Sequence, residues 1–300
     1  MSAVTSVLFD APGPKARLRH RVMTVFGALA IAALLLVLIR ALAEKDQLTA
    51  EKWEPFLDPV TWTSYLLPGL RGTLVAAFYS VILAIVLGTA LGMGRLSGLR
   101  PVRWACGVFV EFFRAVPVLM MMLFAYYLFL FGFQITGDNL SLYGVVAGLT
   151  FYNASVIAEL IRSGVGSLPK GQSEAGLAIG LTPFSTLWHI LLPQAITLML
   201  PSIISQLVVI LKDSALGFLI LYEELLRSGQ TLASSKGNLI PTFFVIAVIF
   251  IVVNYTLTLV ARRVERRLQR SKRGAKPPPA DVMLNQDMVP AAAEATAPSR

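Results

Sequence analysis

The sequence predicts an all-α polytopic membrane protein with six transmembrane helices. Hydrophobic residues make up 56% of the 300 residues and charged residues only 14%, whereas soluble globular chains are roughly one quarter charged. Several uncharged runs are long enough for a helix to cross the bilayer, which takes about 20 apolar residues. Lysine and arginine gather beside these runs in a pattern that assigns the loops to the two faces of the membrane.

The uncharged runs place the six spans. Five runs each fit one span, namely 22 to 39, 72 to 94, 115 to 137, 139 to 158 and 237 to 261. A further run from 175 to 211 is too long for one span, and Pro183, Pro193 and Pro201 divide it. We place the fifth span from about Ala195 to Ala215, so that the residues before it lie outside the bilayer.

Positive charge predicts the orientation. The N-terminal segment 1–21 is basic, the loop after the second span carries three arginines, and the last span runs into a basic segment that begins the tail 266–300. If the spans alternate, these cations share the cytoplasmic face, whereas the acidic segment 43–65 suits the external face. We therefore expect a transmembrane helix at 22–42, an external linker at 43–65 and two cytoplasmic termini. The end of the tail is proline-rich and is expected to be disordered.

The chain lacks the motifs of several enzyme and cofactor classes. GxxxxGK[ST], HExxH and GxSxG are absent, and Cys106 is the single cysteine, which excludes an intramolecular disulfide and a CxxC metal site. The net charge of +9 does not indicate nucleic-acid binding, because its cations lie beside spans, where anionic lipid explains them. We expect no catalytic residue, no cofactor and no metal, which leaves a transporter, a channel or a membrane scaffold.

The segment 171–194, GQSEAGLAIGLTPFSTLWHILLPQ, begins with a short helix outside the bilayer. Ser173 is suited to cap its N-terminus, and Glu174 lies at the positive end of its dipole. Gly180 can end this helix in the left-handed conformation, because glycine has no Cβ to clash. The small residues of the helix let a partner pack near its backbone. The alternative is an amphipathic connector that merely lies on lipid.

A second short helix is predicted directly after the first. Thr182 followed by Pro183 fits an N-cap and a first helical residue. Leu192-Pro193 is then expected to separate this second helix from the fifth span. The segment is therefore interpreted as two short helices bent at Gly180 on the cytoplasmic face.

These residues resemble the EAA loop of the inner-membrane permeases of binding-protein-dependent ABC importers. That loop reads approximately EAA, three residues, G, nine residues and I-x-LP. The matching residues here are Glu174, Ala175, Gly176, Gly180, Ile190, Leu192 and Pro193. The third position is glycine rather than alanine.

Further motifs resemble the polar amino-acid branch, which takes up histidine, glutamine, glutamate and arginine. They are FRAVP at 113–117 for FRGTP, A-x-x-x-x-E-x-x-R at 154–162, PKGQ at 169–172, LPQA at 192–195 and KDSAL at 212–216 for KDTSL. The resemblance covers about residues 66–265. It implies the five-helix core of type I ABC importer permeases (the MetI-like fold), with a coupling loop at 168–193 and one extra N-terminal helix. Thr197 departs from the branch, where arginine is common.

The resemblance also implies partners and a location. The loop would dock on a separate ABC ATPase subunit, present in two copies, through Glu174, Ala175, Gly176, Gly180 and Pro193. The other partners would be a paralogous permease or a second copy of this chain, an extracytoplasmic solute-binding protein, membrane lipid and a small amino-acid substrate. The location would be the bacterial inner membrane.

Charged and polar groups inside spans are costly, and they therefore indicate a pathway. The candidates are Arg114, Asn153, Glu159, Arg162, Ser205, Lys212 and Asp213. A zwitterionic amino acid needs a cation for its carboxylate and an acceptor for its ammonium group. The pairs Glu159/Arg162 and Lys212/Asp213 could equally be self-neutralising structural salt bridges.

Overall similarity to glutamate permeases favours glutamate or aspartate as the substrate, and the cationic candidates favour it weakly. The alternatives within transport are glutamine, arginine, histidine or methionine. The alternative outside transport is a scaffold that holds an ATPase or a sensor at the bilayer, although a scaffold has no need of charges inside its spans.

Overall fold

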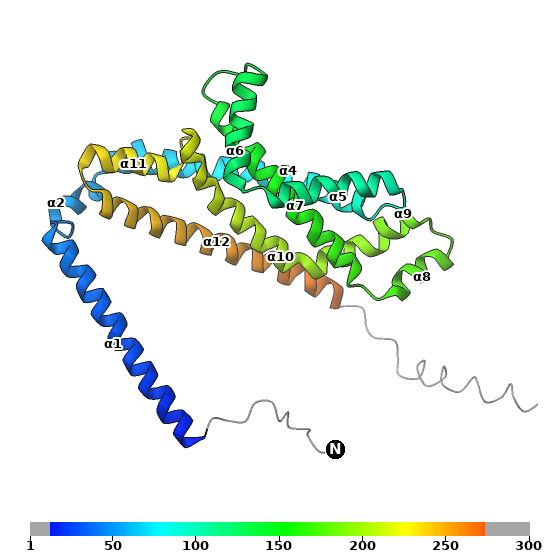
Figure 1. Ribbon diagram of the computed structural model, residues 1–300, viewed down its shortest axis with the longest axis horizontal. Helices are drawn as coiled ribbons and strands as arrows, with labels where there is room; N and C mark the ends of the chain where they lie inside the picture. The colour runs from blue at the N-terminus through cyan, green and yellow to red at the C-terminus, as the bar shows by residue number, and fades with distance from the viewer. Residues whose placement is uncertain (1–12, 274–300) are drawn as a thin grey trace, which may run out of the picture. The chain divides into compact units, whose positions relative to one another are not determined.

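The computed structural model describes residues 13–273, and that part of the chain is helical without strands (Figure 1). The predicted ends of both tails, 1–12 and 274–300, lie outside the described residues. Helices long and apolar enough to span a membrane are Lys15–Glu44, Pro59–Arg95, Leu140–Gly166, Pro183–Ile220 and Leu239–Arg263. A sixth span arises only if one bent helix pair is counted as one. The predicted fold class is confirmed, and the count is five or six.

The chain forms two compact units. Within its described part, one unit contains the residues up to Leu70 together with Leu225–Ala247, and the other contains Arg71–Glu224 and the residues from Val248 onward. Helices α4 (Leu67–Arg95) and α12 (Leu239–Arg273) each begin in the first unit and continue in the second.

The first unit starts with α1 (Pro14–Glu44), the blue helix of Figure 1. The apolar stretch of α1 has no residue buried within the protein, as expected for a helix surrounded by lipid. It begins before the predicted residue 22, because the basic residues of the tail continue the helix.

A set of short helices follows α1. They are α2 (Ala50–Trp53), η1 (Glu54–Leu57), α3 (Pro59–Thr61) and the wide π-helical turn η2 (Trp62–Leu66), and the unit also holds α11 (Leu225–Lys236). Lys52 Nζ donates to the Gly237 carbonyl at 2.8 Å, and Asn238 Nδ2 donates to the Lys52 carbonyl at 3.1 Å. The Trp53 ring packs edge-on against Phe244 with centroids 5.7 Å apart. The linker is therefore held against the turn between α11 and α12.

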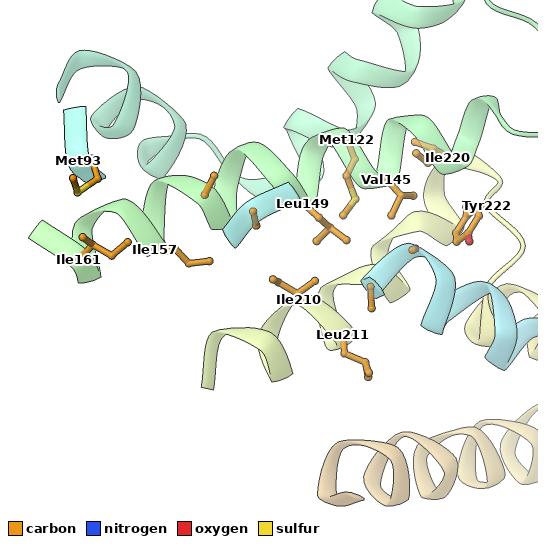
Figure 2. Close-up of a cluster of buried hydrophobic side chains, with 14 of the residues drawn as sticks. Met93, Met122, Val145, Leu149, Ile157, Ile161, Ile210, Leu211, Ile220 and Tyr222 are labelled. Atoms are coloured by element: carbon orange, nitrogen blue, oxygen red, sulfur yellow. The ribbon is translucent and has the colours of Figure 1, made fainter. Parts of the chain in front are cut away.

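The second unit is organised around α7 (Leu140–Gly166), the most buried of the spanning helices. Its Leu149, Ile157 and Ile161 side chains enter a cluster of buried apolar residues that also receives Met122 and Ile210 (Figure 2). These residues come from helices far apart in sequence, and burying them removes apolar surface from water or lipid contact and fixes the helix neighbours.

Two glycines let α4 approach α7 closely. A Cβ placed at Gly88 would lie 2.8 Å from the Ala154 carbonyl oxygen, and one at Gly92 would lie 3.1 Å from Ile161 Cβ. Gly88 and Gly92, four residues apart, therefore serve helix packing within the chain.

The predicted third span, 115 to 137, is wrong in its bounds, because the helix there covers only residues 118–132. The chain forms α5 (Arg100–Ala115) and α6 (Val118–Tyr127), which continues into the wide turn η3 (Leu128–Gly132), and the two arms meet at an angle of 103°. Val116 has extended backbone angles, φ −84° and ψ 130°. The following Pro117 excludes the helical conformation at Val116 and lacks an N–H donor, which explains the bend.

The predicted break at Leu192-Pro193 is also wrong. The helix α9 (Pro183–Thr186) continues through a wide turn, η4 (Leu187–Leu191), into α10 (Leu192–Asp213) and the 3₁₀ segment η5 (Ser214–Ile220). Pro193 is the second residue of α10, just after η4, and a π-type turn rearranges the regular hydrogen-bonding ladder where the proline lacks its N–H. The resulting 38 residues extend about 57 Å, about twice the hydrocarbon thickness.

Candidate functional site

The predicted loop contains α8 (Lys170–Ala178), which lies between two spanning helices. The helix begins three residues before Ser173, with Pro169 preceding it, so the predicted N-cap at Ser173 is wrong. Proline at this position needs no N–H partner and therefore starts the helix earlier. Glu174 and Ala175 are exposed on α8.

The turn after α8 follows the local rules that the sequence indicated. Gly180 adopts φ +84°, its N–H donates to the Leu177 carbonyl at 3.0 Å, and the Leu181 N–H donates to the Gly176 carbonyl at 3.1 Å. The Thr182 hydroxyl accepts from the Ser185 N–H at 3.2 Å, and α9 begins at Pro183. The predicted bend at Gly180 and the cap at Thr182 are confirmed.

Gly176 is buried inside this hairpin of helices. A Cβ at this position would lie 2.6 Å from Thr186 Cγ2 and 3.1 Å from Ile190 Cδ1. Gly176 therefore lets α8 pack on α9 and η4, and it is not on the exposed face of the loop. Pro193 is exposed at the start of α10.

The hairpin exposes an apolar surface that we call the loop face, consisting of Leu177, Ile179, Phe184 and Trp188. Ile179 is 75% exposed and Phe184 is 67% exposed. Leu177 and Ile179 belong to the residues between two spans. Exposed apolar side chains outside a span are typical of a contact with another protein or with a membrane surface.

An ionic cluster joins α4, α5 and α7. Glu159 on α7 accepts from Arg162 at 2.6 Å and 3.0 Å, and its Oε2 lies 2.8 Å from Arg95 Nη1 at the end of α4. Glu111 on α5 accepts from Arg95 at 3.1 Å. The sequence indicated Glu159 and Arg162 as either pathway residues or a structural salt bridge, and the structure shows the two side chains paired.

Arg114 is held more loosely than the other arginines of this cluster. Its Nη1 lies 3.6 Å from Glu111 Oε2 and 4.0 Å from Glu159 Oε2. The cluster thus contains three arginines and two glutamates, with a net charge of +1. It borders a cavity of about 440 Å³, whose lining is Glu111, Arg114, Ala115, Tyr152, Val156, Glu159 and Leu160.

Asn153 is fully buried on α7 and forms a polar contact with α10. Gln206 Nε2 donates to Asn153 Oδ1 at 2.6 Å, and Asn153 Nδ2 donates to the Leu149 carbonyl at 2.7 Å. The predicted candidate Ser205 is exposed, and its hydroxyl donates to the Pro201 carbonyl of its own helix at 3.0 Å.

Lys212 and Asp213 lie at the end of α10. Lys212 is exposed and Asp213 is partly buried. Within the described residues 13–273 no ion pair joins these two side chains, so the salt bridge considered for them is not formed.

Tyr222 lies just after the end of η5. Its hydroxyl donates to the Gly72 carbonyl of α4 at 2.8 Å. Burial, with the nearby Glu224 carboxylate, raises the pKa of Tyr222 to about 12. The phenol therefore remains a neutral hydrogen-bond donor at physiological pH.

The sequence reasoning missed Arg95, Glu111 and Gln206. Arg95 was counted as a loop cation, and only the fold brings it to Glu159. Gln206 is adjacent to the predicted Ser205, and a glutamine inside an apolar run was itself a usable signal.

Residues 80–270 match the model of the family described as "Binding-protein-dependent transport system inner membrane component". The chain is 53% identical over 231 residues to the glutamate transport system permease protein GluD of Corynebacterium glutamicum, covering 77% of this chain and 85% of that one. It is 34% identical to the probable glutamine ABC transporter permease protein GlnP of Bacillus subtilis, covering 68% and 94%. A crystal structure of an amino acid ABC transporter with histidines is similar at a TM-score of 0.63 and 27% identity, covering 71% and 98%.

Proposed function

Because the chain belongs to the family of binding-protein-dependent transport system inner membrane components, we propose that it provides the translocation pathway of an ATP-driven importer for polar amino acids. It is a multi-pass inner-membrane protein and a permease component rather than an enzyme. We assign transport to residues 66–265 and place the extra helix 22–42, the external linker 43–65 and the tails 1–21 and 266–300 outside that core.

The observation that carries this proposal is the loop face on the hairpin of α8 and α9. Leu177 and Ile179 are exposed between two spans, beside the exposed Glu174 and Ala175 of α8. A separate ATPase subunit docks here, because two apolar anchors flanked by small and charged residues fit a protein groove. The basic loops support a cytoplasmic position for this hairpin and both termini. Gly176 and Gly180 shape the hairpin, and Pro193 lies where it joins α10.

The substrate pathway passes the cavity at the ionic cluster. Among the described residues, Arg114 forms two long ion pairs, of 3.6 Å and 4.0 Å, with glutamates, and the net charge of +1 favours a ligand with an excess carboxylate. We therefore propose glutamate or aspartate, as in the name of the Corynebacterium relative. Glutamine is the second candidate, supported by the Bacillus relative. Asn153, with Lys212, Asp213 and Ser205, remains a proposed lining of the same pathway.

The complete importer contains further subunits. The chain pairs with a second copy of itself or with a paralogous permease, and the pair binds two ATPase subunits and an extracytoplasmic solute-binding protein. This assembly follows from the family description, which names binding-protein dependence.

Uptake by a reconstituted importer tests the proposal. Proteoliposomes that contain the permease and its ATPase are supplied with binding protein on the outside. They are expected to accumulate radiolabelled glutamate only when ATP is present in the lumen, on the side of the ATPase. Ala175→Arg on the exposed side of α8 should abolish uptake and ATPase co-purification. Gly98→Arg is the matched control, because no atom lies within 4 Å of a Cβ at Gly98. ATPase binding without uptake of any amino acid would support a scaffold instead.

A further inference from the structure

A side-chain hydrogen bond joins the two arms of the hairpin at its open end. Gln194, in the first turn of α10, donates through Nε2 to Gln172 Oε1 on α8 at 3.1 Å. The same Nε2 donates to the Ile190 carbonyl at 2.9 Å. The two glutamines are 22 residues apart in sequence. The amide donor of Gln194 thus connects α8 to α10.

The hairpin is fixed at two other points. The turn at Gly180 closes its far end with the hydrogen bond from Leu181 N–H to the Gly176 carbonyl at 3.1 Å. Gly176 is buried against Thr186 and Ile190 between the two ends. With the glutamine pair, α8 is therefore held to α9, η4 and α10 at both ends and in the middle.

The helix to which α8 is fixed is a long helix of the second unit. It runs without a break from Pro183 to Ile220, and Gln206 lies on it about 18 Å beyond Gln194 at 1.5 Å per residue. Gln206 donates to the buried Asn153 of α7 at 2.6 Å. A displacement of α8 that is transmitted to α10 therefore reaches a polar contact between two spanning helices.

The geometry points to Gln172 and Gln194 as positioning residues that make α8 and α10 move as one body. This inference rests on the proposed function, since it concerns how movement of a docked ATPase reaches the spans. The pair joins α8 to α10, and Gln172 precedes Leu177 and Ile179 of the loop face, so its substitution is expected to leave these two docking side chains in place and to act on transmission. Loss of the pair lets α8 follow the ATPase while α10 lags behind.

Variants at the two glutamines separate transmission from docking. Gln172→Met and Gln194→Met keep side-chain length and remove the acceptor or the donor, whereas Gln172→Glu keeps an acceptor for Gln194 Nε2. Gln230→Met is the matched control, because Gln230 is an exposed glutamine on α11, outside the hairpin. The readout is the number of glutamate molecules taken up per ATP hydrolysed, measured beside ATPase co-purification in the same proteoliposomes.

Each methionine variant is expected to lower this ratio roughly two- to tenfold, the range that corresponds to loss of one hydrogen bond. ATPase co-purification should be unchanged, the double variant should be no worse than either single one, and Gln172→Glu should retain the ratio of the unaltered protein.

Three results would overturn the pair as a positioning device. They are unchanged ratios in both methionine variants, multiplicative losses in the double variant, or a parallel loss of ATPase binding. Failure of the unaltered protein to take up any amino acid would instead remove the proposed function and this inference with it.

Discussion

Arg95, at the end of α4, lies 2.8 Å from the carboxylate of Glu159 on α7. The Arg95 side chain is only 14% exposed, and Glu159 also accepts from Arg162. One carboxylate therefore holds two helices together and neutralises a largely buried guanidinium.

Glu159→Gln should destabilise the protein. The change removes the ion pair with Arg95 and weakens the hydrogen bonds from Arg162, and hydrogen bonds to charged groups contribute about 1.5–3 kcal/mol. We expect a lower Tm in detergent, measured by thermal aggregation. Glu174→Gln, on the exposed side of α8, is the control and should leave Tm unchanged. An unaltered Tm in Glu159→Gln would show that Glu159 does not stabilise the contact between α4 and α7.

Arg114→Gln should weaken substrate recognition without lowering Tm. Arg114 has only long contacts with glutamates and lines the 440 Å³ cavity, so its charge is available to a substrate carboxylate. We expect the KM for glutamate uptake to rise about tenfold or more, the loss expected for a charge-assisted hydrogen bond. Arg103→Gln, on the same helix, is the control. An unchanged KM would exclude Arg114 from the pathway.

Gly88→Ala should destabilise the protein, although alanine favours helices more than glycine does. Its Cβ would lie 2.8 Å from the Ala154 carbonyl oxygen and from Ile157 Cβ, so α4 and α7 must separate. Gly107→Ala is the matched change, because nothing lies within 4 Å of a Cβ at Gly107. This second variant should be neutral or stabilised by up to about 1 kcal/mol. Equal Tm values for both variants would contradict the close approach of the two helices.

Asn153→Leu and Gln206→Leu should each destabilise the protein, and their effects on Tm should not be additive. Each single change leaves the buried Asn153 or the partly buried Gln206 without its partner, at a cost of up to about 1–3 kcal/mol, whereas the double change removes both groups. The Tm values of the four proteins form a double-mutant cycle. Additive losses would show that these side chains do not interact.

Local signals in the sequence were sufficient for part of the fold. Gly180 and the pair Thr182-Pro183 determine a turn within a few residues, and their conformations were predicted correctly. The bend at Pro117 and the continuous helix through Pro193 were not predicted, because a proline can start, bend or join helices according to the turn that precedes it.

Contacts between distant residues limited what could be predicted of the candidate site. Glu159 and Arg162 are three residues apart on one helix, and their pairing follows from helical spacing. Arg95 reaches Glu159 only because Gly88 and Gly92 bring α4 onto α7. Gln206 forms a hydrogen bond with Asn153, which is 53 residues away in sequence. Periodicity in the sequence carries no information over such a separation.

Under the proposed function, an ATPase drives this permease through α8. The direct measurement is site-specific crosslinking from Ala175→Cys, in a protein whose Cys106 is replaced by serine, within the assembled importer in inverted membrane vesicles. We expect a crosslink to the ATPase subunit that changes in yield when ATP is added, and labelling of the cysteine only from the cytoplasmic side. A cysteine that reacts from the external side, or that never crosslinks to the ATPase in an importer active in uptake, would contradict it.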